Sequence, residues 1–135
     1  MSVENVRKWF MIHTYSGYEK KVKTDLEQKM ETLGFREVVT NILVPEEELT
    51  EIVRGKPKKI YRKLFPAYVM LEMEATREEN EQGISYKVDP RVWYEVRNTN
   101  GVTGFVGVGS DPIPMEEEEV KNIFNIIGVK TPKEA

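Results

Sequence analysis

The sequence predicts an α+β sandwich of the split βαβ kind, with helices packed on a mainly antiparallel sheet. Two apolar segments, residues 8–15 and 67–73, are rich in aromatic and β-branched side chains, and we expect them to pair as central strands. Between them, residues 17–33 repeat apolar side chains at helical spacing. The order strand, helix, hairpin, strand, helix, strand, helix along the chain completes the pattern.

The first helix has signals at both ends. Ser16 and Glu19 form a capping-box pattern, in which the Ser hydroxyl accepts the amide hydrogen three residues on and the Glu side chain reaches back to the cap. We therefore expect the helix to span residues 17–33. Gly34 then stands where a left-handed C-cap is favoured.

Two polar regions are predicted to lie at the surface. Residues 38–44 and 48–53 have the composition of two strands joined around Pro45. This charged hairpin continues into a basic loop at residues 54–63, and we expect the basic hairpin loop as a whole at about residues 45–63. Residues 74–88 are acidic and show no clear period, which predicts an extended polar loop.

The C-terminal half is predicted to hold two more helices and a strand. Asp89 followed by Pro90 is typical of an N-cap and a first helical residue. Residues 101–108 are Gly-rich but apolar enough for a strand. The acidic residues 116–119 favour the first turn of a helix that ends before Gly128.

Length and charge limit the class of protein. A chain of 135 residues suits one domain, and we expect residues 1–130 to form it and residues 131–135 to begin a linker. The net charge of −3 argues against bulk neutralisation of nucleic-acid phosphates. Neither a signal peptide nor an apolar run of membrane-spanning length is visible, so we expect a cytoplasmic protein without membrane contact.

The sequence offers no set of residues for catalysis. It has no Cys, and its single His, His13, is interpreted as a structural strand residue. Neither a thiolate or His-based metal site nor a nucleophilic triad can therefore be assembled. Gly-rich phosphate-binding motifs are missing, and the acidic runs single out no carboxylate pair. We expect a protein that is not an enzyme and that uses no metal or cofactor.

Two groups of residues have the chemistry of a binding surface. Six cations and no acid occur within ten residues: Arg54, Lys56, Lys58, Lys59, Arg62 and Lys63. A solvated hairpin tip explains this cluster as well as attraction to nucleic acid or to an acidic protein surface does. The aromatic residues Tyr15, Phe65 and Tyr68 stand at strand ends, where both core packing and a protein-docking patch are possible.

Four separated motifs form a more specific pattern than any one of them. They are WFMIHTYSGYE at residues 9–19, VP at 44–45, RKLFPAYV at 62–69 and VRNTNGVTGFVG at 96–107. In this order they resemble the N-terminal domain, or NGN domain, of the NusG family of bacterial transcription elongation factors. The similarity extends over about residues 9–128.

The resemblance implies a domain that binds the clamp helices of the largest RNA polymerase subunit. Such a domain modulates pausing, processivity, termination and antitermination, and we expect it to act as a monomer. Tyr15, Phe65 and Tyr68 match the family's polymerase-binding positions. Aromatic side chains suit this role because they supply contact area with little rotamer entropy to lose.

A second group of residues matches positions that contact the non-template DNA strand in the transcription bubble. These residues are Arg97, Asn98 and Thr99. Asn suits base edges, Thr suits a thymine methyl and Arg suits phosphate.

The sequence departs from the family in three places. Ala67 replaces the Gly that is usual in the FPGY motif, and residues 74–88 form a longer connection than is usual. The linker at residues 131–135 leads, by the resemblance, toward a KOW domain that this sequence does not contain.

Two alternatives stay open. An RNA-binding module of the RRM type has a related ferredoxin-like, or RNP-like, strand and helix order and stacks bases on aromatics of its two central strands. Against it, the RRM sequence motif contains the pattern R/K-G-F/Y, and residues 63–71 lack this Gly and have Pro66 instead. A specialised NusG paralogue that acts on particular operons also fits the long acidic segment.

Overall fold

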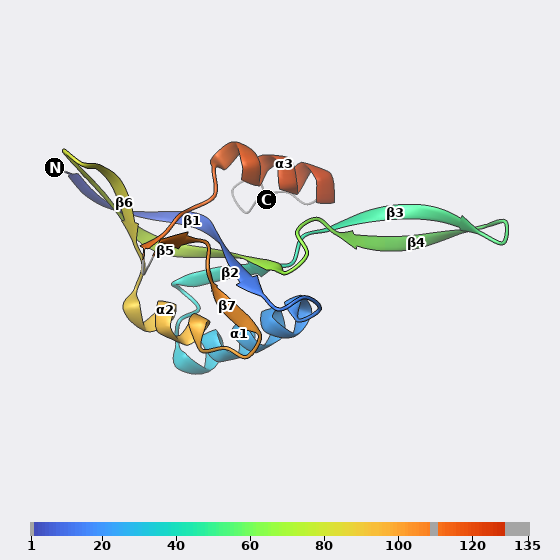
Figure 1. Cartoon of the computed structure of the whole chain (residues 1–135), viewed down its shortest axis with the longest axis horizontal. Coiled ribbons are helices and arrows are strands. Elements are labelled where there is room, and N and C mark those ends of the chain that lie inside the picture. The colour runs from blue at the N-terminus through green and yellow to red at the C-terminus, as the bar shows by residue number, and fades with distance from the viewer. Residues whose placement is uncertain (1, 109–110, 129–135) are drawn as a thin grey trace.

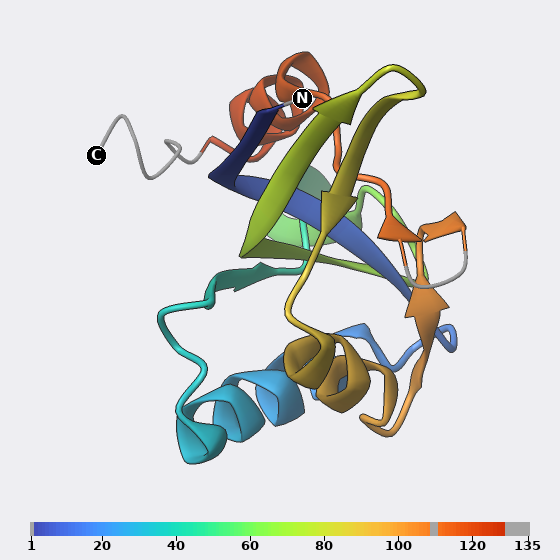
Figure 2. The same ribbon diagram turned by 90° about the vertical axis from the view of Figure 1, so that its left-hand side faces the viewer.

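The computed structural model describes residues 2–108 and 111–128, and within them a central sheet lies between two layers of helices (Figure 1). Helices α1 and α2 cover one face of the sheet and α3 covers part of the other (Figure 2). The elements in chain order are β1 Ser2–Thr14, α1 Glu19–Leu33, β2 Val39–Leu43, β3 Glu46–Val53, β4 Lys56–Lys63, β5 Tyr68–Asn80, β6 Gly83–Lys87, α2 Pro90–Arg97, β7 Val102–Phe105, β8 Gly107–Val108, β9 Asp111–Pro112 and α3 Glu117–Ile127.

The main sheet has the predicted topology. Its strands lie in the order β2-β5-β1-β7, and β6 pairs with the far end of β5. Strands β1 and β5 are antiparallel from Ser2 opposite Glu79 to His13 opposite Tyr68. Because β1 and β2 are both antiparallel to β5, which lies between them, they run in the same direction and α1 connects them as in a split βαβ unit. The α+β fold class is therefore confirmed.

Two hydrophobic cores hold the layers together, one on each face of the sheet. Successive side chains of a strand point to opposite faces, so a single strand contributes to both cores. On one face, Phe10 and Ile12 of β1 pack with Val22 and Leu26 of α1. On the other face, Trp9 packs edge-to-face on Phe124 of α3, with ring centroids 5.5 Å apart. The apolar run of β1 is thus covered on both sides, as its sequence predicts.

The start of α1 differs from the predicted capping box. The helix begins at Glu19, its N-cap is Tyr18, and no side chain caps it. A turn with Gly17 at φ +90° precedes it. The capping prediction for Ser16 is wrong because the Glu19 carboxylate accepts the Ala67 N–H instead of reaching back. At the other end, Gly34 forms the predicted left-handed cap.

The predicted pairing of residues 38–44 with 48–53 is also wrong. Strand β2 joins the main sheet beside β5, where Val39 is buried in the core. Residues 54–63 are not a loop, since β4 pairs with β3 along its whole length. Arg54 and Gly55, both at positive φ, make the tight turn between the two strands. This β3–β4 hairpin projects away from the rest of the molecule (Figure 1).

Residues 74–88 do not form the predicted extended loop. Strand β5 continues to Asn80, turns, and pairs with β6, while β1 begins at Ser2 and pairs along the same stretch. Backbone pairing on both sides makes a strand of this polar segment although it lacks an apolar face. Helices α2 and α3 form as expected, with Asp89 Oδ1 accepting the Arg91 N–H at 2.9 Å. The predicted linker at residues 131–135 lies outside the described residues.

Candidate functional site

The end of β1 meets two other segments at the edge of the molecule. Thr14 N donates to Ala67 O at 2.8 Å, and Tyr15 N donates to Gly101 O at 2.9 Å. The Tyr15 side chain is 62% exposed and stands edge-to-face with Tyr18, which is also exposed. Backbone hydrogen bonds therefore fix a large aromatic side chain that projects into solvent.

The two other predicted docking residues lie on the turn that leads into β5. Tyr68 N donates to Phe65 O at 3.2 Å, and the half-buried Tyr68 ring packs on His13 with centroids 4.5 Å apart. Phe65 is half-buried against the core under α3. Ala67 has φ +71°, so this turn keeps a backbone conformation that favours Gly although it carries Ala. Phe65 and Tyr68 thus pack with one part of the side chain against the protein and leave the other part exposed to solvent.

Glu19 belongs to this site, although its sequence pattern predicts a different role. Its side chain is only 1% exposed, and its carboxylate accepts the Ala67 N–H at 2.8 Å and lies 3.5 Å from Lys63 Nζ. Burial alone raises the pKa of the Glu19 carboxyl, but the Ala67 N–H and the Lys63 ammonium outweigh burial and hold this pKa below its ordinary value. Glu19 therefore links α1, the 65–68 turn and the base of the hairpin.

The second predicted surface lies at the end of α2. The Arg97 guanidinium lies 4.6 Å from the centroid of the Trp93 ring. Asn98 is the exposed C-cap of the helix, and its Nδ2 donates to Tyr94 O at 2.8 Å. Thr99 differs from both, because it is only 5% exposed and its hydroxyl donates to Glu95 O at 2.9 Å. The structure thus places Arg97 and Asn98 on the surface and Thr99 inside.

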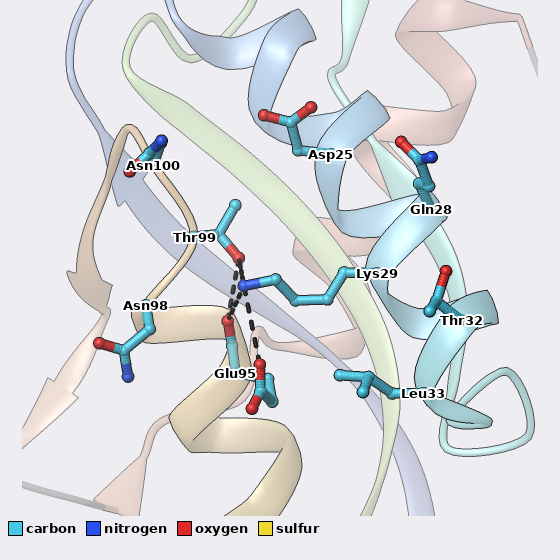
Figure 3. Close-up of a pocket in the computed structure, with 9 residues that line it drawn as sticks. All are labelled: Asp25, Gln28, Lys29, Thr32, Leu33, Glu95, Asn98, Thr99 and Asn100. Carbon is cyan, nitrogen blue, oxygen red and sulfur yellow. Dashed lines mark hydrogen bonds and ion pairs between the residues drawn. The ribbon is translucent and has the colours of Figure 1, made fainter.

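Lys29 of α1 holds this end of α2 in place (Figure 3). Its Nζ donates to Thr99 Oγ1 and to Glu95 O, each at 3.0 Å, and lies 3.8 Å from Glu95 Oε2. These groups line an open groove between α1 and α2 that Asn98 also borders. No local pattern in the sequence marks Lys29, since its partner Thr99 is 70 residues away.

The six predicted cations fall into two groups along the hairpin. The three near its base form ion pairs: Arg62 with Glu47 at 2.6 Å, Lys59 with Glu48 at 3.2 Å and Lys63 with Glu19 at 3.5 Å. The three near its tip, Arg54, Lys56 and Lys58, form no ion pair within the part of the chain that the structure describes. The segment 54–63 contains no acid, but β3 lies opposite and supplies carboxylates to the base.

The arrangement of α3 is unfavourable for an RRM-type mode of RNA binding. That mode needs aromatic side chains exposed on the two central strands. Here Trp9 of β1 and Met70 of β5 are buried beneath Val120, Ile123 and Phe124 of α3.

Metal sites and membrane spans can also be assessed in residues 2–108 and 111–128. No cluster of three or more His, Asp or Glu side chains is arranged there to hold a metal ion. None of the helices described has both the length and the apolar character needed to cross a membrane.

Comparison with known proteins decides the family. The family model described as "Transcription termination factor nusG" matches residues 7–124. The chain belongs to the NusG family. This family is non-enzymatic, which confirms the prediction that the chain is not an enzyme.

Curated relatives agree with this assignment. The chain is 43% identical over 127 residues to the transcription termination/antitermination protein NusG of Halalkalibacterium halodurans, an alignment that covers 92% of this chain and 64% of that protein. It is equally similar to NusG of Staphylococcus epidermidis, of which 63% is covered. The chain therefore spans just under two thirds of the length of these relatives.

A solved structure supports the fold. The structure concerned with domain interaction in Thermotoga maritima NusG superposes with a TM-score of 0.67 at 30% identity. The match covers 93% of this chain and 59% of that one.

Proposed function

We propose that this chain is the part of a NusG factor that docks on the clamp helices of the largest RNA polymerase subunit, in the cytoplasm and as a monomer. From there it modulates pausing, processivity, termination and antitermination. The observation that carries the proposal is that the exposed Tyr15 and the turn that bears Phe65 and Tyr68 meet at one edge of the fold, joined by the Thr14 N–Ala67 O hydrogen bond. Exposed Tyr side chains on a rigid backbone are typical anchors of protein interfaces.

The docking proposal is best tested at Tyr15, because Phe65 also contributes to the core. We expect Tyr15→Ala to weaken binding to core RNA polymerase by about 1 kcal/mol or more, as for an aromatic anchor. Tyr94→Ala is the matched control, since Tyr94 is 59% exposed but lies on α2. Affinities measured by biolayer interferometry should separate the two variants, and equal affinity of Tyr15→Ala and wild type would contradict the docking site.

Phe65→Ala and Tyr68→Ala should weaken the same interaction, each by about 1 kcal/mol or more. Both side chains are half-buried, so their circular dichroism and unfolding curves must be recorded beside the affinities. A loss of polymerase binding that only follows a loss of folded protein would assign these two residues to packing.

We further propose that Arg97 and Asn98 contact the non-template DNA strand, with Thr99 as a positioning residue. The exposed Asn98 amide has one N–H bound to Tyr94 O, and its carbonyl oxygen faces no hydrogen-bond donor among the described residues. The Arg97 guanidinium lies over the Trp93 ring, and Arg97 is exposed, so its N–H groups are open to solvent. Thr99 is bound to Lys29 and Glu95, which fixes the backbone that carries Asn98.

A pausing assay tests this second contact. Asn98→Ala should change pause lifetimes at T-rich non-template sequences severalfold while polymerase binding stays intact, since one good base contact is worth roughly 1–3 kcal/mol of discrimination. Asn100→Ala, an exposed Asn two residues on, is the control. Identical pausing by wild type and Asn98→Ala on T-rich and T-free templates would leave Asn98 with its capping role alone.

A further inference from the structure

The β3–β4 hairpin is long, and among the described residues its contacts with the rest of the domain lie at its base. All residues from 50 to 59 are exposed, and each strand has eight residues, which at about 3.4 Å per residue gives a ribbon roughly 27 Å long. An isolated two-stranded ribbon is marginally stable in water because it buries little apolar surface. We therefore expect this ribbon to have a binding partner.

Charge is distributed unevenly along this ribbon. Near the base, the carboxylates of β3 pair with Lys59 and Arg62. Toward the tip, Arg54, Lys56 and Lys58 form no ion pair among the described residues. With Glu51 as the one acid of residues 51–58, three cations face one carboxylate, so the tip carries a net positive charge although the whole chain has a net charge of −3.

The register places two of the three tip cations on one face of the ribbon. Lys56 lies opposite Val53 and Lys58 lies opposite Glu51, and these two lysines, two residues apart, share a face of the ribbon. The opposite face at the tip carries the Ile52–Pro57 pair. One face of the tip thus carries the two lysines across from Val53 and Glu51, and the other carries the apolar Ile52–Pro57 pair.

We propose that the hairpin tip, with Lys56 and Lys58 on one face and Arg54 in the turn, binds the phosphate backbone of duplex DNA beside the polymerase. A two-stranded β-ribbon has the dimensions to enter a DNA major groove, and lysines neutralise phosphates without reading sequence. Single-stranded nucleic acid fits less well, because it is bound on aromatic platforms and the one aromatic residue of the hairpin, Tyr61, stands near its base opposite Glu48.

This inference rests on the proposed function, because docking on polymerase is what brings the hairpin to DNA. The decisive comparison uses two double variants that remove the same charge. Lys56→Gln with Lys58→Gln removes tip cations, and Lys59→Gln with Arg62→Gln removes cations that ion pairs already neutralise. All four side chains are exposed, so both variants should keep the fold.

Binding is measured to assembled elongation complexes and to DNA-free core polymerase. We expect the tip variant to bind the elongation complex more weakly than wild type does, and to bind DNA-free core polymerase as well as wild type does. The base variant should behave like wild type in both measurements. Between about 50 and 200 mM salt, the affinity of wild type should fall about tenfold more than that of the tip variant, as expected for two phosphate contacts. An equal loss on DNA-free polymerase would show an acidic protein partner instead, and no loss, or an equal loss from both variants, would also overturn the proposal.

A position-specific experiment supplements the affinities. The chain has no Cys, so Lys56→Cys allows attachment of a single iron chelate that cleaves nearby DNA. Cleavage of duplex DNA from position 56, and none from the control Gln82→Cys on the β5–β6 turn, is the expected result. Cleavage confined to single-stranded DNA would overturn the duplex assignment.

Failure of the proposed function would be recognised separately. If wild type does not bind core polymerase, docking is refuted, and the hairpin is then decided on a short DNA duplex by fluorescence anisotropy at low salt. Salt-sensitive binding that the tip variant loses and the base variant keeps supports the hairpin proposal there. Equal binding by all three proteins overturns it.

Discussion

Ile12 in β1 and Ile52 in β3 are the same side chain in two different settings. Ile12 is completely buried between the sheet and α1, whereas Ile52 is 67% exposed near the tip of the hairpin. The sheet body is held by two cores, and the hairpin by backbone pairing and surface ion pairs that contribute little each. The body therefore carries the stability of the domain, while the hairpin is free to present surface.

The largest expected effect compares these two residues directly. Ile12→Ala should lower the free energy of unfolding by about 2–5 kcal/mol, because it leaves a cavity in a packed core. Ile52→Ala should change it by less than about 0.5 kcal/mol, as is usual for exposed positions. Urea denaturation followed by circular dichroism measures both. Similar losses in the two variants would mean that the hairpin packs against the body in solution.

A smaller effect is expected at Glu19, where body and hairpin meet. Glu19→Ala should cost about 1–3 kcal/mol, since the Ala67 N–H loses its acceptor. Glu19→Gln keeps an acceptor and should cost less. The difference between Ala and Gln variants in urea denaturation at pH 7 checks this.

The same residue predicts a pH dependence. Because folding lowers the Glu19 pKa from its ordinary value of 4.5, the ionised carboxylate stabilises the fold above that pH. This stabilisation is lost as the pH falls through the lowered folded-state pKa. Wild type should therefore lose more stability than Glu19→Gln between about pH 5 and pH 3. Parallel curves for the two proteins over this range would contradict the assigned ionisation.

The smallest effect concerns Ala67, whose φ of +71° is unfavourable for a residue with a Cβ. Ala67→Gly should raise the unfolding free energy by about 0.5–1 kcal/mol, since relief of roughly 1–2 kcal/mol of strain exceeds the entropy cost of Gly. Gly34→Ala is the reverse test, because Gly34 has φ +79° and open space where the added methyl group would stand. It should destabilise by about 1 kcal/mol. Destabilisation by Ala67→Gly would show that the turn is not strained.

The sequence predicts the buried body of the domain better than it predicts the exposed strands. The central strands and all three helices were predictable because burial imposes an apolar period on residues such as Val22 and Leu26. The pairing of β3 with β4 and the strands in residues 74–88 are not predicted by the sequence, since strands that bury little apolar surface need no apolar period. Backbone pairing and surface ion pairs hold such segments in place.

The candidate site shows a similar limit. Motifs predict the aromatic residues and the 97–99 segment as candidate site residues, whereas no motif marks Glu19 or Lys29 for the site. Their contacts join residues 48 and 70 positions apart, and no local pattern marks a contact at that distance. Thr99 belongs to the segment predicted to contact DNA, yet the fold turns its side chain inward. A motif identifies a position, and the fold decides which way its side chain points.

The two tryptophans of the chain provide separate optical reporters. Trp9 is buried against Phe124 beneath α3, whereas the Arg97 guanidinium lies 4.6 Å from the centroid of the Trp93 ring. With Trp9→Phe, the remaining emission comes from Trp93 alone. If Arg97 leaves the ring to bind a phosphate, the indole loses its neighbouring charge and its emission shifts, so that capture of the DNA strand can be followed in real time without an attached dye.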